Sequence, residues 1–466
     1  MSRPLEDVEQ YLVTPVNPPR DLDGMDYERC AALHNAIYEH GWIGSGRTAA
    51  DFLAESRLWL DSHPAAADDP GCHASLIEFL RRARTLPSNH EIQFAYQAWG
   101  LDVSLGEHDY AFPDDDQTVT LYQSYMSQCS KPDGLVYDQG THRAIIHLDI
   151  TDELTPEQPW VPLECILTVW IEMIRRGKVV ALPANVGSEK YEKSEDGIFR
   201  MIKGPTTDPA TGAKRLTGDT NPWTIVPWAP QDLADALELW DELVQTVETK
   251  MGLEDHQPES GLLQQETLSR VRTPEGFALK FLMQARLPRF KHIAPGLELP
   301  QDVNFDQSPF LDEISDDINL PPILLFRSDT DLPANQLSWS RYRPSTPRLR
   351  YPCGLYLDSC DREYAYPQED GIKLVLPFEL EGEAKQSDLS PAHGHENLLQ
   401  SGLDPYNIGH AAPFQAFLET AIANIDKGHW SVDAEGVAGG IEKWRDADTE
   451  ENWRNYFIEH GPGGLW

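Results

Sequence analysis

Basic residues that could bind an anion gather in one window of an otherwise acidic chain. The 466 residues include 38 Lys and Arg against 76 Asp and Glu, a formal net charge of −38. Residues 261–350 contain 11 basic and 11 acidic residues, so this window is neutral and the rest of the chain carries the whole negative charge. Arg makes bidentate contacts with phosphate and carboxylate groups. We therefore predict a substrate-binding set of Lys280, Arg286, Arg348 and Arg350.

A second interpretation of these basic residues stays open. They lie on both sides of an acidic loop, residues 302–317, and could neutralise it through surface ion pairs. The sequence contains neither Gly-x4-Gly-Lys-Ser/Thr nor Gly-x-Gly-x-x-Gly, the loops that cradle phosphates in many enzymes. The anion site therefore depends on whether the four side chains share one cavity.

A His-x-Asp pair is the second candidate for chemistry. His147 and Asp149 are two residues apart on a predicted strand, residues 142–150, and Arg143 precedes them. We expect His147 to act as an acid or base, because the ordinary pKa of His lies near neutrality. The same pair could hold Fe(II) together with a distant histidine. The possible third ligands for the metal are His393, His395 and His410.

Two further patterns have residue spacings found in metal sites, but they are less specific signals than the His-x-Asp pair. His393-x-His395 has spacing that binds zinc or iron in some loops. Asp114-Asp115-Asp116 contains the Asp-x-Asp spacing that glycosyltransferases use for a divalent ion and a sugar nucleotide. Solvated loops are the default interpretation of both, and the sequence identifies no cofactor.

The predicted elements mix helices and strands without strict β-α-β alternation. Apolar residues at helical spacing predict helices over residues 27–40, 48–62, 72–85, 163–176, 231–251 and 413–425, and a last helix with a capping box from Asp448 to Glu451. Alternating patterns predict strands over 118–125, 142–150, 223–228, 277–286, 323–327, 349–357 and 372–380. Lys280 and Arg286 would share one face of strand 277–286.

This order of elements predicts an α+β fold with a large, mainly antiparallel sheet wrapped by helices, and such a sheet could close like a barrel. A helical N-terminal subdomain is expected over residues 1–105 and the α+β main domain over 106–466, in one cooperative unit.

Composition limits the compartment and the partners. The N-terminus lacks the apolar segment of a secretory signal, and the six cysteines contain no Cys-x-x-Cys, so a reducing, cytoplasmic location is expected. The excess of acidic residues argues against binding to nucleic acid or to anionic membranes, because proteins bind both through Lys and Arg side chains.

Three functions follow as hypotheses. The first is a transferase of small-molecule biosynthesis that binds a phosphate- or carboxylate-bearing substrate through the basic set, with Arg143, His147 and Asp149 at the reaction centre. The second is a non-haem Fe(II) oxygenase that uses His147 and Asp149. The third is a non-catalytic acidic interaction protein that binds a cationic partner.

Overall fold

The computed structural model describes most of the chain. The described residues are 5, 7–87, 92–95, 98–101, 117–124, 134–147, 160–182, 190–193, 199–202, 206–207, 214–215, 222–225, 227–254, 259–271, 273, 275–303, 305, 308–311, 319–337, 348–361, 368–387, 389–400 and 411–458.

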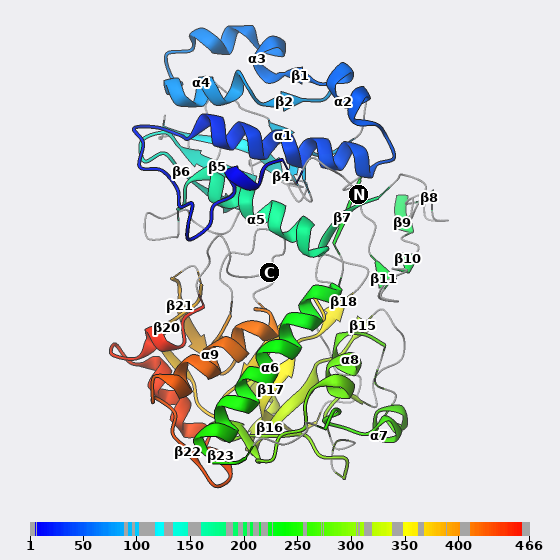
Figure 1. Cartoon of the computed structure of the whole chain (residues 1–466), viewed down its shortest axis with the longest axis vertical. Coiled ribbons are helices and arrows are strands. Elements are labelled where there is room, and N and C mark those ends of the chain that lie inside the picture. Colours follow the sequence, from blue (N-terminus) through cyan, green and yellow to red (C-terminus); the bar gives the residue numbers. More distant parts are fainter. Residues whose placement is uncertain are drawn as a thin grey trace.

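Two lobes make up this fold, and each has its own hydrophobic core (Figure 1). One core cluster draws its buried residues from Leu5 to Trp223, and we call this part the N-lobe. The larger cluster draws its residues from Trp228 to Ile458, and we call this part the C-lobe. Strands that follow residue 105 contribute buried residues to the N-lobe core together with the first helices, and the division expected at residue 105 stays a prediction.

Helices of the N-lobe pack around α1 (Tyr27–Gly44), which contacts α4 (Ala74–Leu80) and α5 (Leu163–Arg176). The Asp26 carboxylate caps α1 by accepting the N–H of Arg29 at 3.3 Å. Gly177 ends α5 with a φ of 77°, a left-handed conformation that favours glycine. The remaining helical elements are η2 (Glu9–Tyr11), α2 (Ala49–Glu55), α3 (Trp59–Ser62) and η3 (Pro64–Asp68).

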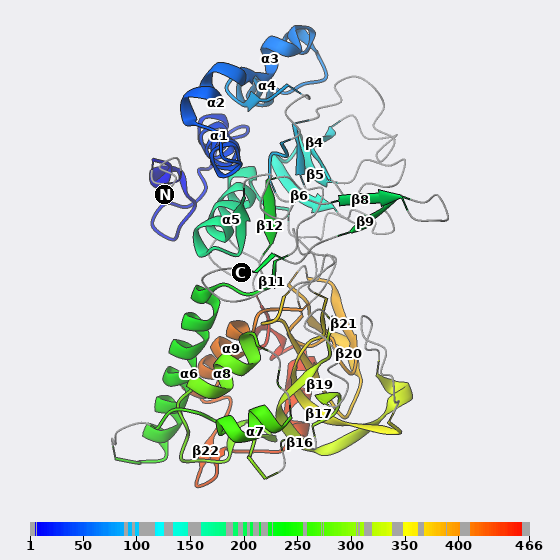
Figure 2. The ribbon, with the colours of Figure 1, turned by 90° about the vertical axis from the view of Figure 1, so that its right-hand side faces the viewer.

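An antiparallel sheet lies beside these helices in the N-lobe (Figure 2). Its order is β3 (Ala98–Leu101), β4 (Thr118–Ser124), β5 (Gly134–Asp138) and β6 (Arg143–His147). Short pairs complete the lobe: β1 (Arg57–Leu58) with β2 (Arg84–Thr85), β7 (Val179–Ala181) with β12 (Trp223–Ile225), β8 (Lys190–Lys193) with β9 (Phe199–Ile202), and β10 (Thr206–Thr207) with β11 (Lys214–Arg215).

The C-lobe contains a seven-stranded sheet. Its order is β19 (Ile372–Val375), β17 (Arg350–Leu357), β16 (Ile323–Pro333), β14 (Leu297–Glu298), β13 (His292–Ala294), β23 (Gly436–Val437) and β22 (Val432–Asp433). The contact between β13 and β23 is parallel and the other pairings are antiparallel. The predicted α+β class with a large, mainly antiparallel sheet is confirmed, but β19 and β22 are edges, so the sheet does not close into a barrel.

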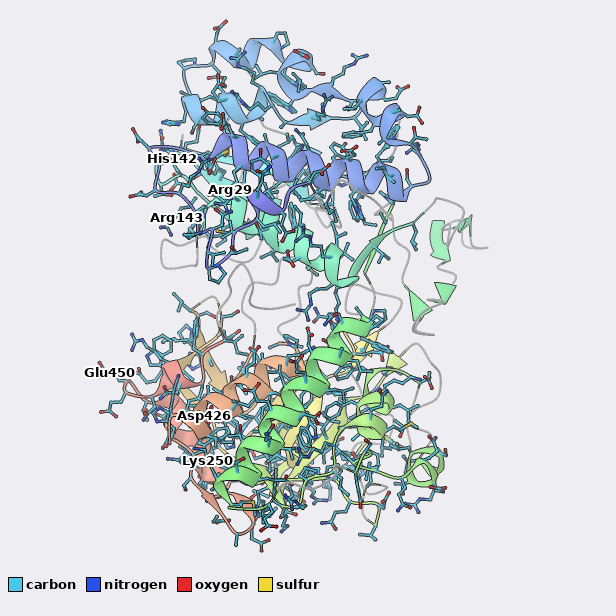
Figure 3. All side chains as sticks on the ribbon, viewed as in Figure 1. Arg29, His142, Arg143, Lys250, Asp426 and Glu450 are labelled. Atoms are coloured by element: carbon cyan, nitrogen blue, oxygen red, sulfur yellow. The ribbon has the colours of Figure 1, made fainter. Side chains whose placement is uncertain are left out.

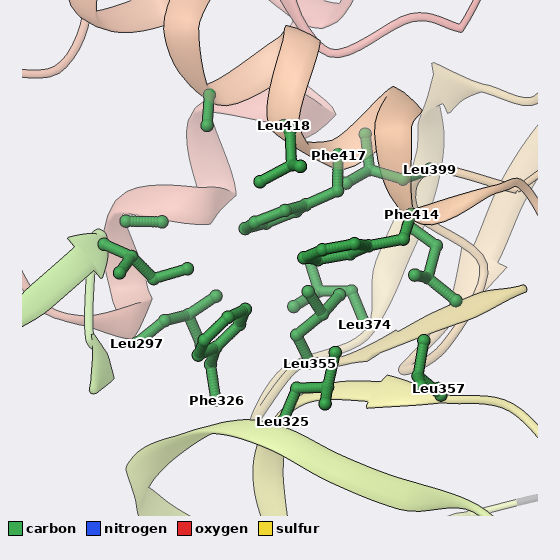
Figure 4. Packing of buried hydrophobic residues seen from close by; sticks show 14 of the residues in the cluster. Leu297, Leu325, Phe326, Leu355, Leu357, Leu374, Leu399, Phe414, Phe417 and Leu418 are labelled. Atoms are coloured by element: carbon green, nitrogen blue, oxygen red, sulfur yellow. The ribbon is translucent and has the colours of Figure 1, made fainter. Parts of the chain in front are cut away.

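Helices cover the C-lobe sheet and complete its core. The longest, α6 (Pro230–Lys250), packs against α9 (Phe414–Asp426). Figure 4 shows Phe414 and Phe417 of α9 facing Phe326, Leu355 and Leu374 of the sheet. The rings of Phe326 and Phe414 are 6.2 Å apart between centroids, within the range of favourable aromatic pairs. Smaller elements are α7 (Gln265–Arg270), α8 (Phe277–Gln284), η7 (Ala334–Gln336), η8 (Ile441–Asp448), η9 (Trp453–Asn455), and the pairs β15 (Asn319–Leu320) with β18 (Cys360–Asp361) and β20 (Leu380–Lys385) with β21 (Pro391–Gly394).

The predicted strand over 277–286 is wrong, because this segment forms helix α8. Phe277, Ala278, Phe281 and Leu282 are buried, and this spacing places them on one helical face. The segment is short and rich in residues with good helix propensity, including Ala, Leu, Lys, Met and Gln, so the period-2 pattern of its apolar residues was not decisive. Lys280 and Arg286 therefore do not share a strand face.

Two other predicted helices differ from the structure. The segment 48–62 breaks after α2, because Ser56 is extended and Arg57 pairs with Thr85. The last segment forms two 3₁₀ helices, η8 and η9, and the expected capping box at Asp448 is absent from this described segment. The Asp448 carboxylate instead accepts the backbone N–H of Ala384 at 2.8 Å and that of Glu381, so it holds β20 in place.

Candidate functional site

Arg143 lies at the start of β6 in the N-lobe, where Figure 3 shows it near the outer edge. Its side chain is exposed and donates to the carbonyl oxygen of Trp160 at 2.8 Å. The backbone of His147 ends β6, but its side chain lies outside the described part, and so does Asp149. The reaction centre expected from these three residues stays a prediction.

Lys280 and Arg286 lie in the C-lobe, on α8 and just beyond it. The Lys280 ammonium is 2.6 Å from the Glu275 carboxylate on the surface. Arg286 contacts Glu248 near the end of α6, and Arg289 contacts the same carboxylate at 3.0 Å. Burial raises the pKa of Glu248, but the hydrogen bond from Arg289 and the charge of Arg286 outweigh burial and lower it. These contacts are intramolecular ion pairs with neighbouring acids.

Arg350 is the first residue of β17 and Arg348 lies two residues before it, and both are exposed. The Arg350 guanidinium donates to the carbonyl oxygen of Asp331 on β16. Ala278 of α8 lines a hollow together with Leu357 at the opposite end of β17. A strand rises about 3.3 Å per residue, so Arg350 lies roughly 23 Å from Leu357 along β17. The described side-chain contacts give Lys280, Arg286 and Arg350 separate partners, and they do not bring these residues to a common point.

The His-x-His pattern does not converge either. His393 is exposed on β21, whereas His395 is buried and lies 3.0 Å from the carbonyl oxygen of Leu376 through Nδ1. Gly394 between them has a φ of 77°, so the strand ends there and the two rings separate. His410 and Asp114–Asp116 lie outside the described residues. Within the described ranges, no group of three His, Cys, Asp or Glu side chains is arranged to bind a metal.

A buried ion cluster at the junction of the lobes was not predicted. The Lys178 ammonium, just after α5, lies 3.1 Å from Asp232 on α6 and 2.8 Å from Asp370 before β19. Lys178 is 2% exposed. Burial lowers the pKa of Lys178, but the two carboxylates outweigh this effect and raise it above the ordinary value of lysine. The cluster therefore fixes the end of α5 to the start of α6.

Several buried polar atoms next to this cluster lack a hydrogen-bond partner in the described part of the chain. They are Arg176 Nε, Trp228 Nε1, Gln368 Nε2 and Gln415 Oε1. Arg176 uses another nitrogen to contact the Asp235 carboxylate of α6 at 2.5 Å. Arg176 therefore links the region of the buried cluster to the exposed surface of α6.

Acidic side chains follow that surface of α6 and continue onto α9. Asp235, Glu238 and Glu242 recur at three- and four-residue spacing on one side of α6, and Glu419 comes from α9. We call these four residues the acidic face. Burial raises the pKa of Glu419, and the charges of Asp235 and Glu242 add to this rise against the opposing charge of Arg176. Among the described residues, Asp235 forms an ion pair with Arg176, whereas Glu238, Glu242 and Glu419 form none.

The described cavities are small. One, of about 270 Å³, lies beside α8 and is lined by Ala278, Leu320, Pro321, Ile323, Leu357, Asp358, Cys360 and Glu369. A second cavity, of about 440 Å³ with its open mouth included, lies beside strands β14 and β16 of the C-lobe sheet. The predicted basic set lines neither of these two cavities.

Comparisons with known proteins add no identification. A scan against protein-family models, a search of curated proteins and a search of solved structures each found no match. None of the helices in the described ranges has the length and hydropathy needed to cross a bilayer.

Proposed function

We propose that the chain is an interaction protein that binds a cationic, Lys/Arg-rich partner protein, and that the acidic face is the principal contact. The observation that carries this proposal is the distribution of charge. Acidic residues exceed basic ones by 38, so one-to-one pairing would leave half of the 76 carboxylates without a basic residue. Lys280, Arg286 and Arg350, three of the four residues expected to form an anion site, contact acidic side chains or a carbonyl group of their own lobe.

The environment of Glu419 supports the acidic face as the contact. Burial raises the pKa of Glu419, and the charges of Asp235 and Glu242 add to this rise against the opposing charge of Arg176, so the ionised form is destabilised there. A Lys or Arg side chain from a partner would relieve this repulsion and would gain Coulomb energy from several carboxylates at once. Cations of the same helices lie at their ends, as Figure 3 shows for Lys250 at the end of α6.

Salt dependence tests the charge-driven binding. A fluorescent peptide of alternating Lys and Ala should bind the full chain with a dissociation constant that rises steeply between about 50 mM and about 500 mM NaCl, because salt screens exposed charges. A peptide of alternating Glu and Ala is the control and should not bind. Equal binding of the two peptides, or affinity for the Lys peptide that does not change with salt, would contradict the proposal.

Neither the transferase nor the oxygenase hypothesis gains support from a described cavity, and both stay predictions. Their central residues, the His147 side chain and Asp149, lie outside the described part of the chain.

A further inference from the structure

A pocket on the C-lobe sheet combines an apolar floor with two opposite charges. It lies between β14, β16 and the segment that follows β14, and it measures about 440 Å³ with its open mouth included. The floor is buried: Phe305 is 4% exposed, Leu324 5% and Leu325 1%. Glu298 and Arg327 are also lining residues, and their side chains are 34% and 45% exposed. The pocket therefore has an apolar base and a charged rim.

The two rim charges are directly opposite in the sheet but do not pair with each other. Glu298 faces Arg327 in the antiparallel register of β14 and β16. Opposite charges at such positions ordinarily attract each other and stabilise the sheet. Here Arg327 contacts Asp331 at 3.3 Å, and Glu298 accepts from Lys291 at 2.7 Å and lies 3.7 Å from Nε2 of His292. The rim thus has a cation and an anion as separate groups, each in a half-exposed ion pair that a ligand would have to replace.

Ser308 supplies an unused polar group in the same pocket wall. The residue is 6% exposed, and its hydroxyl has no hydrogen-bond partner among the described residues. A buried hydroxyl without a partner destabilises the folded state, because it has lost its hydrogen bonds to water. The hydroxyl oxygen has almost no accessible surface, so a polar ligand group would remove that penalty once the Ser308 side chain rotates toward the pocket.

We propose that this pocket binds a free α-amino acid with an apolar side chain. The Arg327 guanidinium would bind the ligand carboxylate, since its planar fork matches the two oxygens. The Glu298 carboxylate would bind the ligand ammonium. The ligand side chain would lie against Phe305 and Leu325, and the Ser308 hydroxyl would donate to the ligand carboxylate. This ligand class satisfies the cation, the anion, the hydroxyl and the apolar floor together.

Calorimetric titration of the full chain with L-leucine tests the ligand class. Three comparison compounds each lack one feature: isocaproate lacks the ammonium, isopentylamine lacks the carboxylate, and glycine lacks the apolar side chain. L-leucine should bind at least about tenfold more tightly than each of them, since a charged hydrogen bond or a buried leucine side chain contributes that much. No detectable binding of L-leucine at millimolar concentration, or equal affinity for isopentylamine, would overturn the proposal.

Single substitutions test the residues. Arg327→Gln and Glu298→Gln should each weaken L-leucine binding by about tenfold, because each removes one charged hydrogen-bond partner. Ser308→Ala should weaken it by a few-fold while leaving the fold intact. Arg81→Gln is the matched control, since Arg81 is a similarly exposed arginine paired to Glu78 at 3.2 Å away from the pocket. Unchanged affinity in both Arg327→Gln and Glu298→Gln, checked against an unchanged melting temperature, would contradict the assignment.

Discussion

The Lys178 ammonium lies 2.8 Å from the Asp370 carboxylate, and this contact joins the end of α5 in the N-lobe to the C-lobe sheet. Both residues are nearly completely buried. Burial raises the pKa of Asp370, and Lys178 opposes this rise. A buried charge is tolerated only when its partners remain in place, so the orientation of the lobes at this point depends on the cluster.

Removal of the Lys178 charge should therefore be strongly destabilising. Lys178→Met leaves Asp370 buried without its cation and leaves Asp232 only the more distant Arg176 at 3.6 Å, and we expect a loss of about 3–5 kcal/mol in the free energy of unfolding. Urea unfolding followed by circular dichroism measures this loss. Adding Asp370→Asn to Lys178→Met should recover part of it, because fewer uncompensated charges remain. Lys443→Met, which removes an exposed partner of Asp446, is the control and should cost less than about 1 kcal/mol. Similar losses for Lys178→Met and Lys443→Met would refute the role of the cluster.

Arg29 should anchor the N-terminal segment to α1. Its guanidinium is buried and donates to the carbonyl oxygens of Tyr11, Leu12, Asn17 and Pro18 at 2.6–3.0 Å. Lysine cannot reproduce this planar set of donors, so Arg29→Lys should cost about 2–4 kcal/mol. In Arg29→Lys, hydrogen exchange should become faster relative to the unmodified chain, and more so in residues 7–20 than in α6. Arg57→Lys, an exposed substitution in the same lobe, should leave exchange unchanged. Protection of residues 7–20 in Arg29→Lys equal to that of the unmodified chain would contradict the anchor.

His34 should make the N-lobe sensitive to acid. Burial lowers the pKa of His34 to about 4, and the ring lies 2.8 Å from both the Tyr122 hydroxyl and the Arg84 carbonyl. The unfolded chain binds a proton at His34 below about pH 6.5, whereas the folded chain resists it until about pH 4. This contribution to stability is therefore complete above about pH 6.5 and is lost as the pH falls toward 4, by about 3 kcal/mol in total.

The measurement is the free energy of unfolding as a function of pH. His34→Gln should be less stable near neutral pH, but it should lose less stability than the unmodified chain between about pH 6.5 and pH 4, because no proton binds at this position. His429→Gln is the control, since His429 is exposed. Identical pH dependence in His34→Gln and the unmodified chain would show that His34 does not titrate as described.

The sequence predicted the long, strongly patterned elements well. The apolar stripes of α5 and α6 identified both helices, and the alternation of residue types in β4 and β6 identified both strands, although consecutive residues of these strands are buried on both faces. The short segment α8 was assigned to the wrong class, because eight mostly apolar residues fit both periods. The expectation that Lys280 and Arg286 converge depended on that assignment.

The buried cluster could not be predicted from local pattern. Lys178 contacts carboxylates that are 54 and 192 residues away in the chain, and a tertiary contact of that range leaves no spacing in the sequence. The signal available was a single lysine between Gly177 and an apolar run, which is equally typical of an exposed position. Charge composition was more informative, because the surplus of carboxylates follows from counting alone.

The most direct test of the proposed function is a comparison of two charge-neutralised variants. The first combines Glu238→Gln, Glu242→Gln and Glu419→Gln on the acidic face. The second combines Asp61→Asn, Glu266→Gln and Glu383→Gln, which remove the same charge from exposed, scattered positions. Fluorescence anisotropy measures the affinity of both variants for the Lys/Ala peptide. The first variant should bind about tenfold more weakly than the unmodified chain and the second less than about twofold more weakly. Equal weakening in the two variants would contradict the acidic face as the binding surface.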